Sequence, residues 1–213
     1  MTSSDSPRRI LMIAFHFPPV QGSSGMHRTL AFSRYLKEDH GWEPTVLTVH
    51  PRAYERTSDD LLGDIAPGVE VVRAFGLDTK RHLSLAGKYP SWLALPDRWI
   101  SWWFGATRAG RRILKERRHD VIWSTYPIAT AHAIARTLHR RSGLPWVADF
   151  RDSMTEGHYP KDRAQWNAFR KIERRASEEA AKCVFTTEGT RAMYSARFPD
   201  CLLYTSDAAD DLA

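Results

Sequence analysis

Residues 9–49, RILMIAFHFPPVQGSSGMHRTLAFSRYLKEDHGWEPTVLTV, decide the fold of this chain. After Arg9 the segment opens with an apolar run to residue 15 that shows no alternation, which is typical of a strand buried on both faces. Pro18 and Pro19 then end any strand, because proline cannot donate to a strand ladder. A loop of mostly small residues at 20–25 follows, and it leads into a helical pattern.

That helical pattern covers residues 26–39, with apolar side chains near one face, and Gly41 is placed to end it. Residues 44–49 form a second strand of the buried type. The same alternation resumes further along the chain. Further expected strands are 69–72, 120–124, 145–149 and 183–187, and further expected helices are 97–115, 129–140, 163–182 and 188–197. The sequence therefore predicts an α/β protein with a Rossmann-like, doubly wound parallel sheet.

Length and composition set the class. The chain has 213 residues, of which 42% are hydrophobic and 26% charged, enough for one globular domain with a core. It has no run of roughly 20 uncharged apolar residues and no signal-peptide pattern at its start. Its two cysteines, Cys183 and Cys201, exclude a disulfide framework and a zinc-type cysteine cluster. We therefore expect a cytoplasmic protein without a metal site.

The end of the sequence differs from the rest. Residues 201–211 resemble a translated sequencing adapter of the transposase-based kind, and they carry no helix or strand pattern that continues from 200. We therefore expect a disordered N-terminus at 1–8, a Rossmann-like domain at 9–200 and a non-native tail at 201–213. On this interpretation the chain is a fragment. Without the tail's three aspartates the net charge rises from +6 to +9, and a basic surface attracts phosphates.

Polar residues cluster where the expected strands end. The clusters are 16–28, 124–132, 149–152 and 186–190. Ligands of open parallel sheets bind beyond the carboxyl ends of the strands, so these clusters predict a site at that edge.

Two of the clusters carry specific chemistry. The loop from Gly22 through Ser23 to Gly25 leads into a helix, and such a loop lets a phosphate approach the backbone and the free N–H groups. A plain turn that requires positive φ explains the loop equally well. Asp149 and Asp152 flank Arg151, and this arrangement can bind sugar hydroxyls or hold the guanidinium for a phosphate. An internal ion pair that shapes the loop is the alternative.

Histidines and tryptophans give weaker indications. His16, His27 and His132 stand at strand ends or helix starts, where an imidazole can act as a general base or bind phosphate, although a structural role is the alternative for each. Residues 89–104 include four tryptophans beside arginine, a composition that suits contact with lipid headgroups. The one-turn spacing of Trp99 and Trp103 fits the core equally well.

Taken together and in collinear order, these segments resemble the N-terminal domain of family-four glycosyltransferases, the retaining group with the GT-B architecture. The matching segments are 10–31, 41–48, 95–99, 120–125, 144–152 and 186–188. The resemblance implies the acceptor-side half of an enzyme that moves a sugar from a nucleotide-sugar to a glycan or lipid-linked acceptor. A donor-binding domain would follow beyond residue 200, and the fragment alone would be inactive. The nucleotide-sugar would be a co-substrate, with no cofactor.

The resemblance also places residues in the cleft. The candidates are Asp152 and His132 for catalysis, and Gly22, Ser23, Gly25, Arg28, Asp149, Arg151 and Glu188 for binding of donor or acceptor. We expect a cytoplasmic protein that can contact the inner face of an anionic membrane and that does not bind nucleic acid. Two alternatives remain: a non-catalytic module that binds anionic lipid or nucleic acid, and a sugar-nucleotide epimerase with the GT-B architecture.

Overall fold

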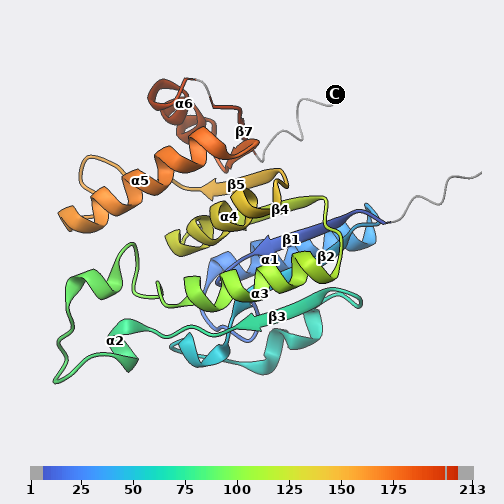
Figure 1. Cartoon of the computed structure of the whole chain (residues 1–213), viewed down its shortest axis with the longest axis horizontal. Coiled ribbons are helices and arrows are strands. Elements are labelled where there is room, and N and C mark those ends of the chain that lie inside the picture. Colours follow the sequence, from blue (N-terminus) through green and yellow to red (C-terminus); the bar gives the residue numbers. More distant parts are fainter. Residues whose placement is uncertain (1–6, 200, 206–213) are drawn as a thin grey trace, which may run out of the picture.

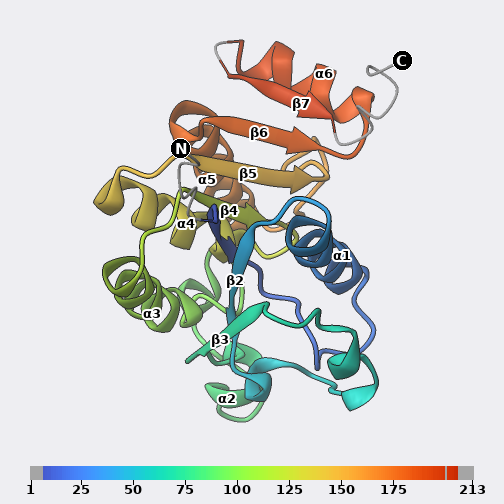
Figure 2. The ribbon, with the colours of Figure 1, turned by 90° about the vertical axis from the view of Figure 1, so that its right-hand side faces the viewer.

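A computed structural model describes residues 7–199 and 201–205, and it contains a seven-stranded sheet in which every neighbouring pair is parallel (Figures 1 and 2). The strands are β1 Arg9–Ile13, β2 Glu43–Val49, β3 Glu70–Ala74, β4 Val121–Thr125, β5 Trp146–Arg151, β6 Lys182–Phe185 and β7 Leu203–Thr205. Their order is β3-β2-β1-β4-β5-β6-β7, so the winding reverses between β1 and β4. This order confirms the predicted doubly wound, Rossmann-like sheet.

Helices cover both faces of the sheet. They are α1 Ser24–Glu38, α2 Thr79–His82, α3 Trp102–Glu116, α4 Ala129–Ser142, α5 Arg163–Glu179 and α6 Glu188–Arg197, with 3₁₀ turns at Pro51–Ala53, Asp59–Asp64 and Ser91–Ala94. Figure 2 shows α1 on one face and α3, α4 and α5 on the other. Right-handed crossovers require this division, because the connections after β3 run back across the sheet in the opposite direction.

Side chains of β1 alternate between the two faces. Leu11 and Ile13 belong to the larger core cluster, which includes Trp102 of α3, whereas Ile10 and Met12 pack with Leu30 of α1. None of the four β1 side chains is more than 6% exposed. The unalternating apolar run therefore reflects burial on both faces, as the sequence predicts.

The predicted helix at 97–115 begins later, at Trp102. Asp97 explains the difference, because its buried carboxylate accepts hydrogen bonds from the backbone N–H of Trp99 at 3.0 Å and from that of Thr130 at 2.8 Å. Asp97 therefore ties the segment before α3 to the first turn of α4. Burial raises the pKa of this carboxyl group.

The sequence shows no strand pattern after residue 200, but Leu203–Thr205 forms a strand. This segment pairs with β6 as the parallel edge strand β7, in the register Cys183 to Leu203 and Phe185 to Thr205. Residue 200 and residues 206–213 lie outside the described residues. The resemblance of the tail to a sequencing adapter concerns its origin, and it stays a prediction. Residues 1–6 of the predicted disordered N-terminus also lie outside them, whereas the carbonyl of Arg8 accepts a 2.8 Å hydrogen bond from Glu43.

The tryptophan-rich stretch belongs mostly to the core. Trp102 is fully buried and packs edge-to-face on Phe15, with ring centroids 5.5 Å apart. Trp99 and Trp103 are half-buried, and Trp92 is 68% exposed. The core interpretation therefore holds for three of these four tryptophans.

Candidate functional site

The loops that follow β1, β4 and β5 meet at the carboxyl edge of the sheet, beside the point where the winding reverses. Gly25, in the first turn of α1, lies against residues from all three loops. A Cβ atom added to it would stand 2.9 Å from Nη1 of Arg151, 3.3 Å from Nδ1 of His16 and 3.5 Å from Cδ of Pro127. Only glycine fits this position without a shift of its neighbours.

At the other end of the loop, glycine is required at position 22 for a different reason. Gly22 has a φ of +77°, and an added Cβ would meet nothing within 4 Å, so this position requires a turn rather than close packing. Ser23 is the N-cap residue of α1, but its side chain makes no capping hydrogen bond. The first turn of α1 also has no acidic residue, so the positive end of its dipole faces the edge of the sheet uncompensated.

Two cavities open beside this loop and share Gly22 and Ser23. The larger, of about 550 Å³, lies between the loop after β1 and the segments at 53–56 and 98–99. Its lining residues are Phe15, His16, Val20, Gln21, Gly22, Ser23, Ala53, Tyr54, Glu55, Arg56, Arg98 and Trp99. The smaller cavity, of about 360 Å³, reaches His27 and Asp60 on the other side of the loop. Aromatic rings and polar groups together line the larger cavity, as in small-molecule sites.

Arg28 and Asp149 form a buried pair beneath the loop. Nε and Nη2 of Arg28 donate to the carboxylate of Asp149 at 3.0 and 3.1 Å, and Oγ1 of Thr125 donates to the same carboxylate at 2.9 Å. The Asp149 side chain is fully buried, whereas that of Arg28 is 24% exposed. Asp149 thus lines no described cavity, and its carboxylate is occupied by Arg28 and Thr125.

Arg151 lies at the end of β5 in a left-handed conformation, with a φ of +61°. Non-glycine residues seldom adopt this conformation, and it turns the side chain back toward Gly25. Its Nη1 donates to the carbonyl of Tyr126 at 3.5 Å, and its buried Nε has no hydrogen-bond partner among the described residues. The next residue, Asp152, is exposed, and its backbone N–H is bound to the carbonyl of Phe150 at 2.7 Å.

His16 lines the larger cavity. Burial, together with the nearby Arg151 guanidinium, lowers the pKa of His16 to about 4, so its imidazole is neutral near pH 7. Its buried Nδ1 has no hydrogen-bond partner among the described residues. A neutral imidazole nitrogen of this kind can accept a hydrogen bond from a ligand.

His132 is placed differently from what the sequence suggested. It is fully buried, and its ring packs against Phe150 at 4.9 Å between centroids. Oγ of Ser124 accepts the indole N–H of Trp146 at 2.8 Å, and it forms a second hydrogen bond of 2.8 Å with Nδ1 of His132. Burial lowers the pKa of His132 to about 3. In this structure His132 therefore lies in the core and lines none of the described cavities.

Glu188 begins α6 at the same edge of the sheet, but it does not contact the cluster around Gly25. Its carboxylate accepts hydrogen bonds from Nε of Arg191 at 2.8 and 2.9 Å, and this pairing lowers the pKa of Glu188. Among the candidates, the structure therefore brings together Gly25, Arg151 and the Arg28–Asp149 pair. Glu188 lies apart from them.

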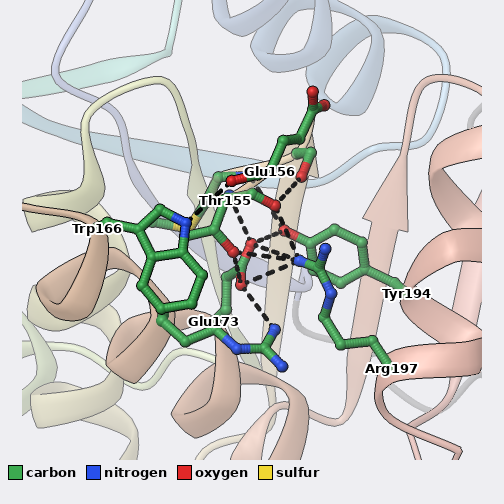
Figure 3. Close-up of polar contacts among 9 residues, drawn as sticks. Thr155, Glu156, Trp166, Glu173, Tyr194 and Arg197 are labelled. Atoms are coloured by element: carbon green, nitrogen blue, oxygen red, sulfur yellow. Dashed lines mark hydrogen bonds and ion pairs between the residues drawn. The ribbon is translucent and has the colours of Figure 1, made fainter. Parts of the chain in front are cut away.

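A buried carboxylate that the sequence did not reveal supports the loop after β5. Glu173 of α5 is fully buried and accepts the backbone N–H of Thr155 at 2.9 Å and its hydroxyl at 2.6 Å (Figure 3). The hydroxyl of Tyr194 and the guanidinium groups of Arg170 and Arg197 also donate to it. Glu173 thus joins the loop to α5 and α6. In sequence it is one acid in a highly charged helix, and nothing there distinguishes it.

Among the described residues, no group of three or more His, Cys, Asp or Glu is arranged to hold a metal ion. The polar groups at this edge of the sheet are instead arginine guanidinium groups, a neutral imidazole and backbone N–H groups. Such a set suits an anionic or hydroxyl-bearing ligand.

Solved structures share this fold at low sequence identity. UGT2 of Phytolacca americana, in its apo form, is 12% identical, with a TM-score of 0.61 over 97% of this chain and 54% of that one. Sucrose-phosphate synthase of Thermosynechococcus elongatus is 13% identical, with a TM-score of 0.61 over 93% and 47%. UGT89C1 of Arabidopsis thaliana, complexed with UDP-L-rhamnose, is 13% identical, with a TM-score of 0.56 over 94% and 51%.

The chain thus spans about half the length of these proteins, and its fold is the Rossmann-like half of a GT-B glycosyltransferase. No curated protein matches the chain in sequence. A family model does match, namely that of the glycosyl transferase 4-like domain, and the match covers residues 24–201. With its fold, its glycine loop and this match over most of its length, the chain belongs to the glycosyl transferase 4-like domain family.

Proposed function

We propose that this chain is the acceptor-side domain of a retaining glycosyltransferase, which moves a sugar from a nucleotide-sugar to a glycan or lipid-linked acceptor. The observation that carries the proposal is the cavity of about 550 Å³ at the carboxyl edge of the sheet. This cavity shares the glycine loop with the start of α1, so an acceptor in it would lie beside a site for phosphate. Membership of the family favours transfer over a non-catalytic binding module.

The donor diphosphate would lie against the start of α1. Gly22 and Ser23 line both cavities just before this helix, and Arg28 and Arg151 supply positive charge nearby. These groups would stabilise the negative charge that develops on the departing diphosphate, which requires neither a metal nor a resident cofactor. One structural neighbour, UGT89C1 of Arabidopsis thaliana, is complexed with UDP-L-rhamnose, and this supports a nucleotide-sugar as co-substrate.

In the acceptor cavity, we propose that the neutral His16 accepts a hydrogen bond from an acceptor hydroxyl. Asp152 is an exposed carboxylate at this edge and would contact the sugar or the acceptor. Asp149 would act through Arg28, since its own carboxylate is occupied. Glu188 remains a proposed contact of the donor side only.

For transfer, the proposed enzyme needs a donor-binding domain in addition to this chain. Among the described residues, every helix is too short or too polar to cross a bilayer. We propose a cytoplasmic enzyme that docks peripherally on the inner face of an anionic membrane.

The first experiment reads the source DNA outward from the codons of residues 9–200. If the frame continues with a second Rossmann-like domain, the joined protein is assayed with radiolabelled UDP-glucose, UDP-N-acetylglucosamine and GDP-mannose on a lipid and glycan extract of the source organism. We expect transfer from one donor by the joined protein and none by the chain alone. Turnover by the chain alone, or release of an epimerised nucleotide-sugar without acceptor, would contradict the proposal.

The matched variants are Gly25→Ala and Gly63→Ala. An added Cβ crowds Arg151 and His16 at position 25, whereas it meets nothing within 4 Å at position 63. Transfer that is lost in the first variant and kept in the second would tie the reaction to the start of α1. Equal activity of both would remove Gly25 from the site.

A further inference from the structure

One face of α3 is cationic along most of its length. Arg108, Arg111, Arg112 and Lys115 are all exposed, and with Phe104 they fall within an arc of about 100° on a helix of 3.6 residues per turn. The opposite face carries Trp102, Ala106 and Ile113, which are buried in the core. We call the exposed set, residues 104, 108, 111, 112 and 115, the α3 stripe.

The positive charge of the α3 stripe is largely unpaired. Within the described residues, Arg108, Arg111 and Lys115 have no carboxylate within 4 Å, whereas Arg112 stands 3.6 Å from Glu116 in an exposed pair. Glu116 is also the first acidic residue of α3 and ends the helix. The stripe therefore presents a local excess of positive charge to solvent, beyond what the net charge of +6 requires.

Two exposed aromatic rings lie at one end of the α3 stripe. Phe104 is 68% exposed at the start of α3, and Phe75 is 51% exposed at the end of the edge strand β3. Between α3 and β3 runs a groove of about 610 Å³, lined by both Phe75 and the cationic side chains of the stripe. Figure 1 shows α3 and β3 side by side, and Gly105 of α3 packs directly on the backbone of Phe75.

We propose that the α3 stripe and Phe75 form the surface by which this protein docks on a bilayer that contains anionic phospholipids. Basic side chains gathered on one exposed helix face attract anionic headgroups, and the neighbouring aromatic rings enter the acyl boundary, while the apolar face of α3 stays in the core. A bilayer fits better than a nucleic acid, because the exposed rings of Phe104 and Phe75 stand together at one end of the stripe and do not alternate with its cations, as stacking of successive bases requires.

This inference deepens the proposed peripheral location and rests on it. It also places the membrane contact on the α3 stripe and Phe75. The sequence had suggested residues 89–104 for this contact, but most of the tryptophans in that stretch are in the core. Vesicle binding is measured without donor or acceptor. Its failure would therefore leave the proposed transfer standing, and inactivity of the enzyme would leave the docking surface standing.

The test is co-sedimentation of the full chain with two kinds of vesicle, phosphatidylcholine alone and phosphatidylcholine with phosphatidylglycerol in equal parts. We expect binding to the anionic vesicles only, weakened as salt shortens the range of the interaction. Each basic residue near an anionic surface contributes about 1 kcal/mol, so the triple variant Arg108→Gln, Arg111→Gln and Lys115→Gln should lower the partition coefficient roughly a hundred-fold. Phe104→Ala should lower it roughly ten-fold through lost apolar burial.

The control variant removes the same charge from exposed positions on and just before α5. Its changes are Lys161→Gln, Lys171→Gln and Arg174→Gln. We expect it to bind vesicles within about two-fold of the parent, since general attraction to the surface falls off within a Debye length. Equal losses in the two triple variants would overturn the proposal, because they would show attraction by net charge alone. Binding to a single-stranded oligonucleotide but not to anionic vesicles would overturn it in favour of a nucleic-acid surface.

Discussion

Replacement of Asp149 by asparagine tests whether this carboxylate holds Arg28 in place. The side chain is fully buried and accepts two N–H groups from Arg28, at 3.0 and 3.1 Å, and the hydroxyl of Thr125 at 2.9 Å. Asparagine keeps the shape but removes the charge and turns an NH₂ group toward one of these donors. The variant therefore leaves the guanidinium of Arg28 without its counterion.

The magnitude follows from the burial of the two partners. Removal of one partner of a buried pair costs about 3–5 kcal/mol, and because Arg28 keeps 24% exposure and can regain some water we expect about 2–3 kcal/mol. For a chain of this size each kcal/mol lowers the melting temperature by about 2–4 °C, so Asp149→Asn should melt roughly 4–12 °C below the parent.

Thermal unfolding followed by circular dichroism measures this change, with Glu43→Gln as control. Glu43 pairs with Arg9 at 2.6 Å, but both side chains are about one-third exposed, so its loss should cost at most about 1 kcal/mol. The double variant Asp149→Asn with Arg28→Met should be more stable than Asp149→Asn alone, because it also removes the stranded cation. If Asp149→Asn melts with the parent, or if the double variant is less stable than the single one, the argument fails.

Three further predictions follow from the same structure. Gly25→Ala should weaken binding of UDP to the joined enzyme at least ten-fold by calorimetry, since the new Cβ pushes Arg151 from its place; unchanged affinity would place the diphosphate elsewhere. Glu173→Gln should destabilise the chain by about 3 kcal/mol in urea unfolding, because five donors lose a buried charge, while the exposed Glu178→Gln costs under about 1 kcal/mol. Folding lowers the pKa of His132 from 6.5 to about 3. Between these pH values the unfolded state binds a proton that the folded state does not, so the free energy of unfolding declines as the pH drops from 6.5 toward 3. In His132→Gln the slope of unfolding free energy against pH should be shallower by up to about 1.4 kcal/mol per pH unit, and an identical slope would contradict the burial argument.

The sequence by itself determined the class of fold. An apolar run such as 10–15 has no polar face to turn to water, so it must lie inside a sheet with helices on both sides. The alternation of such runs with amphipathic helices then leaves a parallel, doubly wound sheet as the solution, and the structure has it. The edge that carries the candidate site follows from the same reasoning, because the polar clusters come where parallel strands end.

Tertiary structure alone decided which of the candidate residues line a cavity and which are buried against other side chains. Sequence spacing cannot show that Asp149 forms an ion pair with Arg28, which is 121 positions away. It also cannot show that His132 contacts a serine and two aromatic rings inside the core. It also cannot single out Glu173 among the acids of α5, because its partners come from the loop after β5 and from α6. The physical reason is that burial and partner choice depend on contacts between distant segments, whereas periodicity reports only how each segment divides its own faces between core and water.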